Sequence, residues 1–233
     1  MTHRSQSVAP GRVVHDTAGM STGKSYDRAY FDNWYRRQGI NRGAILTRKV
    51  ALAVAAAEYH LVRPIRSVLD VGCGEGVWQA PVLAMRPKAQ YLGLDSSEYA
   101  VARYGPKRNL RLARFGDLAQ LRFDRAFDLL VCADVLHYLD DAEVRRGLSG
   151  FAELCHGVAY LEAYCAEDQI DGDLEGFRRR PVSWYRREFA RAGLVACGNH
   201  LWLSPVLADE AAALEVLSPV RRSPRQHIQA ESA

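Results

Sequence analysis

Three glycines at alternate positions stand directly after a short apolar segment that contains one acid. The stretch reads Val68-Leu69-Asp70-Val71-Gly72-Cys73-Gly74-Glu75-Gly76. A continuous apolar run is typical of a buried parallel strand, and glycines just past its end let the backbone approach a ligand closely. The helix after such a turn directs its free N–H groups and its positive dipole end at that ligand. The pattern therefore indicates a ligand site built largely from backbone.

The glycine spacing narrows the class of ligand. A dinucleotide fingerprint needs G-x-G-x-x-G, but the third glycine here is Gly76 and Val77 follows it. A phosphate-binding P-loop needs Gly-Lys followed by Ser or Thr at the end of its glycine turn, and no such triplet follows this apolar strand. What remains is an apolar residue followed by Asp-x-Gly-x-Gly-x-Gly. It resembles the first motif of the class I S-adenosylmethionine-dependent methyltransferases.

Apolar runs alternate with helical stretches from Arg66 to about Val195, which predicts a parallel sheet with helices on both faces. We expect strands at Ser67–Val71, Tyr91–Leu94, Leu110–Phe115, Phe127–Ala133, Val158–Tyr164, Leu194–Cys197 and His200–Leu203. We expect helices at Val77–Met85, Glu98–Tyr104, Ala142–Leu154 and Ser183–Arg191, with Asp141 and Ser183 as N-caps and Gly193 as a stop signal. The pair Gly198-Asn199 is a hairpin signal, so the last strand should run antiparallel to its neighbour.

The expected fold is a doubly wound, seven-stranded Rossmann-like α/β sheet, mostly parallel with an antiparallel last strand, as in the class I methyltransferases. Two helices before it, Tyr26–Arg37 and Ala44–Leu61, are placed to cap the ligand-bearing edge. We expect one methyltransferase domain over residues 26–217, with the helical cap at 26–62 and the core at 66–203. Residues 1–25 and 218–233 are polar and aperiodic and are expected to be disordered tails.

Polar residues follow the predicted strands in order, and ligands in doubly wound sheets bind at the carboxyl ends of the strands. Asp95 follows the second strand, where a carboxylate can accept hydrogen bonds from both hydroxyls of a ribose. Asp117 follows the third strand and can accept from the exocyclic amine of an adenine, while Leu118 can stack on the ring. Each acid also has a plain alternative, since Asp95 could cap the next helix and Asp117 a turn.

The resemblance to the methyltransferases assigns further roles. It implies that Asp70 braces the glycine turn by accepting backbone N–H bonds, and that Gly72, Gly74 and Gly76 let the methionine part of S-adenosylmethionine pass. Tyr26 and Tyr30, one helical turn apart, are the tyrosines expected over its methionine end, whereas Phe31 and Trp34 are expected to pack as a lid. The cofactor-binding residues implied are Tyr26, Tyr30, Asp70, Gly72, Cys73, Gly74, Gly76, Asp95, Ser96, Asp117, Leu118 and Ala133.

His137 is the candidate for acid–base catalysis. The fourth strand, Phe127–Ala133, runs into Asp134-Val135-Leu136-His137-Tyr138, which resembles the family's fourth motif. An imidazole titrates near neutral pH and suits a base that deprotonates a hydroxyl or an ammonium group. The alternative is that His137 shapes the cofactor pocket and moves no proton.

The segment Cys165–Pro181 is rich in charge and lies where many family members contact their acceptor. It holds Glu167, Asp168, Asp171, Asp173 and Glu175, followed by Arg178-Arg179-Arg180. It is either a solvated loop or a set of acids that recruits an amine-bearing acceptor. Its spacing is not that of a calcium-binding EF-hand loop, and no Cys pair has C-x-x-C spacing, so we expect no metal site. Trp184 and Tyr185, next along, could line the acceptor site or pack beneath their helix.

Composition limits the partners and the compartment. Residues 1–25 and 218–233 each carry a net charge of +2, which leaves the body of this +4 chain neutral. A neutral body lacks the basic face expected of a nucleic-acid binder. No apolar stretch is long enough to cross a bilayer, and the five scattered cysteines are typical of reduced cytoplasmic thiols.

The leading hypothesis is an S-adenosylmethionine-dependent methyltransferase that acts on an oxygen or nitrogen of a small molecule and releases S-adenosylhomocysteine. The chain lacks the signatures of adenine-N, cytosine-C, arginine and metal-dependent catechol methyltransferases. Two alternatives stay open: a macromolecular methyltransferase that holds RNA or protein with its basic tails, and a non-catalytic protein that binds S-adenosylmethionine. The acceptor and the number of subunits are left open.

Overall fold

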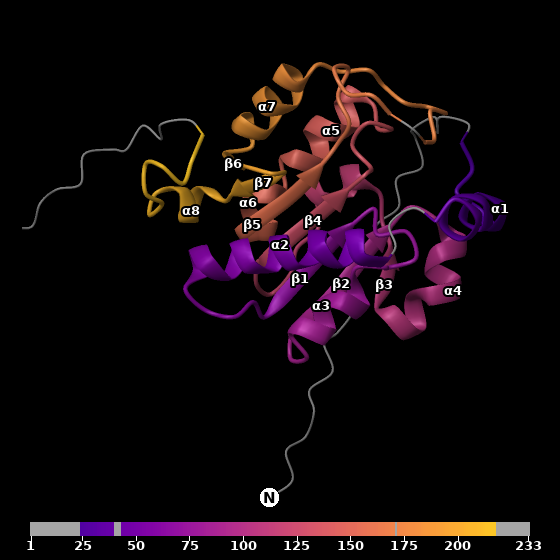
Figure 1. The fold of residues 1–233 in the computed structure, drawn as a ribbon, viewed down its shortest axis with the longest axis horizontal. Helices are drawn as coiled ribbons and strands as arrows, with labels where there is room; N and C mark the ends of the chain where they lie inside the picture. Colours follow the sequence, from indigo (N-terminus) through magenta and orange to yellow (C-terminus); the bar gives the residue numbers. More distant parts are fainter. Residues whose placement is uncertain (1–23, 40–42, 171, 218–233) are drawn as a thin grey trace, which may run out of the picture.

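A seven-stranded sheet runs through the protein in the order β3-β2-β1-β4-β5-β7-β6 (Figure 1). This computed structural model describes residues 24–39, 43–170 and 172–217. The strands are β1 (Ser67–Val71), β2 (Gln90–Asp95), β3 (Leu110–Leu112), β4 (Phe127–Ala133), β5 (Cys155–Glu162), β6 (Val195–Gly198) and β7 (Leu201–Leu203). The first five pair in parallel, and β7 is antiparallel to both β5 and β6. The predicted fold class, including the antiparallel last strand, is confirmed.

Helices cover both faces of the sheet, because its central strands are buried and largely apolar and must be shielded on both sides. On one face lie α2 (Gly43–Leu61), α3 (Gln79–Met85), α4 (Glu98–Arg108) and α8 (Pro205–Ala208). On the other lie α5 (Asp141–Leu148), α6 (Phe151–Leu154) and α7 (Val182–Arg191). This arrangement brings the carboxyl ends of β1, β2 and β4 to a common edge, which α1 and the segment after it approach (Figure 1).

The N-terminal cap differs from the single predicted helix at Tyr26–Arg37. Asp27 caps α1 (Arg28–Phe31) by accepting from the Tyr30 N–H at 3.0 Å, and the chain then continues as a π-helix, η1 (Asp32–Arg37). π-Helices are rare and short, and they occur often at functional sites. The wider turn buries Phe31 and Tyr35 together against Ala100 of α4.

Three predictions about helix ends were wrong. The predicted helix Ala142–Leu154 is split into α5 and α6 at Ser149-Gly150, where a Cβ on Gly150 would lie 2.1 Å from the Leu118 carbonyl oxygen. The N-cap of α5 is Asp140, which accepts from the Glu143 N–H at 2.7 Å, and not Asp141. The N-cap of α7 is Pro181 and not Ser183.

Strand ends also moved from their predicted positions. β3 stops at Leu112, and Phe115–Ala119 form a short 3-10 helix, η2, instead of continuing the strand. β5 begins at Cys155 and ends at Glu162, before Tyr164. The last hairpin turns at Asn199 and His200, with φ of 50° and 64°, so Gly198 belongs to β6.

The expected tails fall almost wholly outside the described residues; Lys24 and Ser25 are the exceptions. Asp171 of the charged segment also lies outside them. Among the described helices, none is both long and apolar enough to cross a lipid bilayer.

Candidate functional site

A cavity of about 100 Å³ opens at the carboxyl ends of the central strands. Residues predicted to bind a cofactor line much of it: Tyr26, Tyr30, Gly72, Gly74, Asp95, Ser96 and Ala133. Six further residues complete the lining, namely Phe31, Tyr35, Asp134, Val135, Tyr138 and Leu139. The fold therefore gathers, at one place, residues from the lid, the glycine turn and the ends of β2 and β4.

The glycine turn is fixed by hydrogen bonds to β2 and its end. The Gly72 N–H donates to the Leu94 carbonyl at 2.7 Å, and the Gly74 N–H donates to Asp95 Oδ2 at 2.6 Å. Gly72 and Gly74 have φ of 69° and 53°, in the left-handed region that favours glycine. A Cβ on Gly72 would lie 2.3 Å from Val135 Cγ2, so this close approach of two chain segments also requires glycine.

Asp95 takes over the bracing role that was assigned to Asp70. Its second oxygen accepts from the Ser97 N–H at 2.8 Å, and the side chain is buried. Burial raises the pKa of Asp95, and the hydrogen bonds from Ser97 and Gly74 oppose this rise. The N-cap of α4 is Ser97, so the alternative of Asp95 as the cap is set aside.

The prediction that Asp70 accepts backbone N–H bonds at the turn was wrong. Its carboxyl group accepts from the hydroxyl of Tyr91 at 2.5 Å, and Tyr91 lies on β2 two residues before Gly93, the register partner of Asp70. Burial raises the pKa of Asp70 to about 7, although the hydrogen bond from Tyr91 works in the opposite direction. Asp70 thus lies beneath the turn as a buried polar contact between β1 and β2.

Besides Asp70, four predicted residues do not line the cavity. Cys73 is buried in the hydrophobic core, and a Cβ on Gly76 would point at Leu110. Asp117 is exposed and accepts from the Arg114 N–H at 2.8 Å, which is the turn-capping alternative. Leu118 is a residue of η2, and its side chain is fully buried in the hydrophobic core. Contacts of Asp117 and Leu118 with an adenine stay predictions.

Aromatic side chains from the cap form one wall of the cavity. The Tyr26 and Tyr30 rings meet edge to face with centroids 5.0 Å apart, and Phe31 contacts Tyr99 of α4 at 5.8 Å. Tyr35 reaches the glycine turn itself, since its hydroxyl oxygen is 2.5 Å from the position that a Cβ on Gly74 would take. Sequence reasoning missed Tyr35, although its place four residues after Phe31, on the same helix face, was a usable signal.

His137 lies behind the cavity wall and not at its surface. Only 1% of its surface is exposed, and its Nδ1 accepts from the Tyr164 N–H at 3.3 Å. Burial, together with the Lys24 and Arg180 charges, lowers the pKa of His137 to about 4. At neutral pH the imidazole is therefore neutral, and its proton is on Nε2, 3.3 Å from Asp134 Oδ1.

The charged segment folds onto the cap through a buried ion pair. Lys24 donates to Asp173 and also to the Glu175 carbonyl at 3.0 Å, and its ammonium group lies 4.0 Å from the centroid of the Tyr138 ring. The Tyr138 hydroxyl in turn donates to the Asp173 carbonyl at 2.8 Å. One acid of this segment thus already holds an amine of the same chain.

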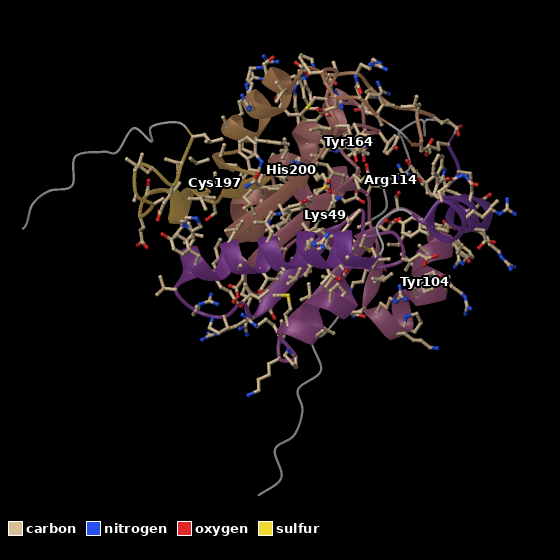
Figure 2. The ribbon with its side chains drawn as sticks, viewed as in Figure 1. Lys49, Tyr104, Arg114, Tyr164, Cys197 and His200 are labelled. Carbon is tan, nitrogen blue, oxygen red and sulfur yellow. The ribbon has the colours of Figure 1, made fainter. Side chains whose placement is uncertain are left out.

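A second ion pair lies next to the cavity, at the end of β5. Lys49 of α2 donates to both oxygens of Glu162, at 2.7 and 2.8 Å, and its position on the helix can be followed in Figure 2. Tyr164, two residues beyond Glu162, is exposed, and its ring centroid lies 5.5 Å from that of His137. Trp184 and Tyr185 pack in the core beneath α7, which is the structural alternative for them.

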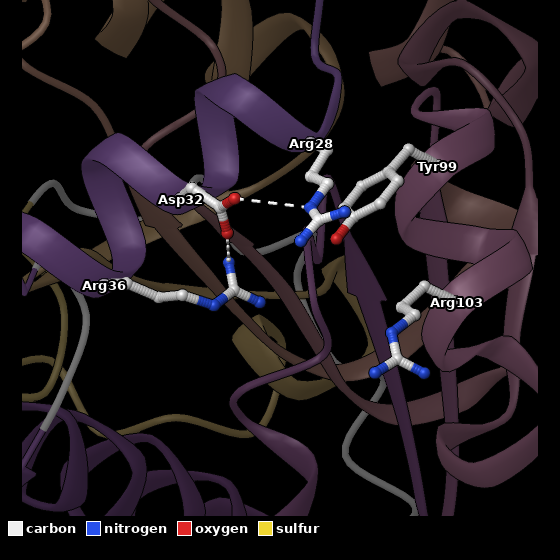
Figure 3. A pocket seen from close by; sticks show the side chains of 5 residues that line it. All are labelled: Arg28, Asp32, Arg36, Tyr99 and Arg103. Atoms are coloured by element: carbon white, nitrogen blue, oxygen red, sulfur yellow. Dashed lines mark ion pairs between the residues drawn. The ribbon is translucent and has the colours of Figure 1, made fainter.

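A larger cavity of about 380 Å³ lies outside the cap, between η1 and α4 (Figure 3). It is lined by Arg28, Asp32, Arg36, Tyr99 and Arg103. Arg36 is already paired with Asp32 at 2.8 Å and with Glu75 at 3.0 Å. No strand end or glycine of the turn contributes to its lining. The smaller cavity is therefore the functional candidate, since it holds the chemistry-bearing strand ends.

Comparison with known proteins identifies the core. A sequence profile of the methyltransferase domain matches residues 69–157. Over these residues the chain is similar to a methyltransferase domain. Trans-aconitate 2-methyltransferase of Deinococcus radiodurans is 40% identical over 81 residues, which are 34% of this chain and 30% of that protein. Malonyl-(acyl-carrier protein) O-methyltransferase of Legionella pneumophila is 34% identical over 86 residues, 35% of this chain and 30% of that protein.

The chain thus matches about 30% of the length of these two curated relatives. Among solved structures, DesVI of Streptomyces venezuelae superimposes with a TM-score of 0.60 at 17% identity, covering 76% of this chain and 98% of that one. At this identity the likeness concerns the fold. The methyltransferase domain includes the glycine turn, Asp95 and Asp134, whereas the aromatic cap lies before the matched residues.

Proposed function

We propose that the protein is an S-adenosylmethionine-dependent methyltransferase that methylates an oxygen or nitrogen atom of a small molecule. The observation that carries this proposal is the buried Asp95 carboxylate, which is bound to the Gly74 N–H and lines the cavity at the strand ends. An acid so placed in a methyltransferase domain is suited to a ribose.

The residues at the turn fit this cofactor on two counts. Each carboxylate oxygen has two lone pairs, so Asp95 can accept ribose hydroxyls in addition to the Gly74 and Ser97 N–H groups. Gly74 has no side chain on the side that faces Tyr35, where a Cβ would collide with the Tyr35 hydroxyl group. A cofactor's methionine part can therefore lie along main chain once Tyr35 withdraws.

Bound S-adenosylmethionine supplies an electrophilic methyl group on a sulfonium. The chain's own residues hold the reactants and exclude water. In-line geometry held in this way accounts for roughly 7–11 kcal/mol of a barrier. We assign the ribose to Asp95 and Ser96, the methionine part to Gly72, Gly74, Ala133, Tyr26 and Tyr30, and the adenine to Asp117 and Leu118. Cys73 and Gly76 are assigned to shaping the turn.

The cap must move for this function. Ligand pockets of drug-sized molecules commonly measure about 300–1,000 Å³, whereas the cavity measures about 100 Å³. Phe31 and Tyr35 fill the difference, since both lie against the Gly74 turn. We infer that the segment Arg28–Arg37 closes over an empty site and retracts when the cofactor enters.

A small-molecule acceptor is favoured over a macromolecule. The names of the two relatives give trans-aconitate and a malonyl group on a carrier protein as acceptors. The body of the chain is neutral, which gives no attraction to nucleic acid. The five cysteines are all unpaired, and we include a cytoplasmic location in the proposal on that ground.

Calorimetric titration with S-adenosylmethionine and S-adenosylhomocysteine tests the proposal, with wild-type protein and Asp95→Ala. We expect wild type to bind both ligands. Asp95→Ala should lose at least about 2 kcal/mol of binding free energy, because the variant removes the charged acceptor of the ribose hydrogen bonds. Asp124→Asn, an exposed acid before β4, is the matched control. Absence of binding by wild type at millimolar ligand contradicts the proposal.

A further inference from the structure

Two acids line the cavity, and they differ in what they bind. Both oxygens of Asp95 accept backbone N–H groups. Asp134 Oδ1 faces His137, whereas Oδ2 contacts no hydrogen-bond donor within the described part of the chain. The Asp134 side chain is also 28% exposed, which gives it access to a ligand in the cavity. Asp134 is thus the acid whose second oxygen is available for chemistry.

The backbone holds Asp134 in an unusual conformation. Its φ is 65°, a left-handed value that residues other than glycine seldom adopt. Its N–H donates to the Glu162 carbonyl at 3.0 Å, which ties the residue to the end of β5. Such backbone strain persists where the surroundings enforce it, and it is concentrated at functional sites. The conformation places the carboxylate between the ends of β4 and β5.

His137 cannot serve as the base in this arrangement. The only lone pair of the neutral ring is on Nδ1, and it already accepts from the Tyr164 N–H. The opposite nitrogen carries its proton and faces Asp134 Oδ1 at 3.3 Å. A buried N–H beside one carboxylate oxygen holds that oxygen in place and leaves the other turned elsewhere. His137 is therefore a positioning residue for Asp134.

The charges around Asp134 cancel in pairs. Lys49 of α2 is paired with Glu162 of β5, and Lys24 of the cap is paired with Asp173. Burial, then the Glu162 charge, raises the pKa of Asp134 to about 6; Asp173 acts in the same direction, while Lys49 and Lys24 oppose the rise. Tyr138 and His137 face the same space and are neutral at pH 7. Among the residues that the structure describes, Asp134 is thus an acid on this side of the cavity that is ionised above pH 6 and has no lysine or arginine paired with it.

We propose that Asp134 is the general base of the methyl transfer, and that the acceptor is a hydroxyl or a protonated amine, not a carboxylate. This inference rests on the proposed function. Asp134 Oδ2 takes the proton from the acceptor's O–H or N–H. The acceptor's lone pair forms the new bond to the methyl carbon, and the electron pair of the broken C–S bond returns to sulfur, which leaves as a neutral thioether.

The acceptor class follows from charge. A carboxylate needs no base and would be repelled by ionised Asp134, because neither neighbouring lysine is free to offset that charge. A hydroxyl or an ammonium group needs a base to remove its proton, and ionised Asp134 does not repel either group. This distinguishes the protein from the relative named for trans-aconitate, an acid.

The experiment measures transfer from S-adenosylmethionine labelled in its methyl group to a panel of phenols, aliphatic alcohols, amines and carboxylates that includes trans-aconitate. Wild type is compared with Asp134→Asn, His137→Leu and His137→Gln from pH 5 to 9, with Asp124→Asn as the control. Asparagine tolerates a left-handed backbone, so Asp134→Asn keeps the turn while removing the base. Cofactor binding is measured by calorimetry for every variant.

We expect methylation of hydroxyl or amine acceptors, with kcat/KM rising through about pH 6 in wild type. Asp134→Asn should lower kcat by at least about 100-fold and abolish that rise, with little change in cofactor affinity. His137→Leu should shift the pH profile, and His137→Gln, which keeps a donor, should restore part of it. Three results overturn the inference: transfer to carboxylates alone, unchanged kinetics in Asp134→Asn, or cofactor binding without transfer to any panel member. Lack of cofactor binding by wild type overturns instead the proposed function.

Discussion

At the scale of single residues, the acids at the strand ends divide the work by what surrounds them. Asp95 is bound to two backbone N–H groups, Asp70 to a tyrosine hydroxyl, and Asp134 keeps one oxygen free. Their positions follow from the sequence, because each acid lies in or directly after an apolar strand. Their partners do not, because Tyr91 and Glu162 come from neighbouring strands whose register the sequence leaves unspecified.

Asp70 gives a prediction about pH and stability. Its pKa is raised from 3.8 to about 7, so the folded protein holds this proton over a pH range in which the unfolded chain has lost it. The stability of the folded state contributed by this group is therefore lost as the pH rises from about 4 to 7. The variant Asp70→Asn has no carboxyl group at this position, so it does not lose stability in this way as the pH rises. Between pH 5 and 8 its free energy of unfolding should improve relative to wild type by about 2 kcal/mol.

Urea unfolding of both proteins at the two pH values checks this, and Asp124→Asn, an exposed acid, should show no such trend. A stability difference between Asp70→Asn and wild type that does not depend on pH would contradict the raised pKa of Asp70.

At the scale of elements, the cap α1–η1 and the glycine turn form one closure. Phe31 and Tyr35, four residues apart, lie on the same side of the cap and both reach Gly74. The sequence showed that this stretch is aromatic and close to the site. It did not show that Tyr35 and not Trp34 faces the turn, because the positions three and four residues after Phe31 both lie on the same side of a helix.

Gly74→Ala tests that closure. The new Cβ would lie 2.5 Å from the Tyr35 hydroxyl oxygen at a φ of 53°, so the variant should displace Tyr35 and weaken S-adenosylmethionine binding at least tenfold, roughly 1.4 kcal/mol. Gly176→Ala is the matched control, since it has a φ of 74° with nothing within 4 Å and should bind normally. Adding Tyr35→Phe, which removes the nearest atom, should recover part of the binding. Equal loss in both glycine variants would mean that backbone strain, not the closure, is responsible.

At the scale of the whole molecule, a group of ion pairs and hydrogen bonds around Asp128, here called the latch, ties the segment after α2 to the start of β4. It lies at the end of the sheet opposite the cavity. Asp128 at the start of β4 accepts from Arg63 at 2.9 and 2.7 Å and from the Arg66 N–H, and His156 Nε2 lies 2.8 Å from it. Asp128 is buried, and these partners outweigh its burial and lower its pKa. The latch therefore holds the chain between α2 and β1 against β4.

Asp128→Ala should destabilise the protein by about 1–3 kcal/mol at neutral pH, because it removes the buried carboxylate to which Arg63 and the Arg66 N–H donate. The loss should shrink as the pH falls toward the lowered pKa of Asp128, where protonation weakens the wild-type latch as well. Chemical denaturation gives the stability. Calorimetry on the folded variant should give an unchanged affinity for S-adenosylmethionine, and a parallel loss of affinity would place the latch within the site.

The sequence predicted most of the fold, since the alternation of apolar runs and helices specifies the parallel sheet, and the Gly198-Asn199 signal specifies the antiparallel end. It missed features set by distant packing, such as the break at Gly150 against the Leu118 carbonyl. In the site, it found the glycine turn and Asp95. It did not single out Asp134 as a base, although the place of this acid directly after β4 was a usable signal.

A crystal structure of the protein grown with S-adenosylhomocysteine tests the central claim most directly. We expect the ribose hydroxyls within hydrogen-bond distance of Asp95, the homocysteine part along Gly72 and Gly74, and Tyr35 displaced from its position against the turn. Density for the ligand elsewhere, for instance in the cavity of Arg28 and Arg103, or a site that stays closed by Tyr35 at saturating ligand, would contradict the account.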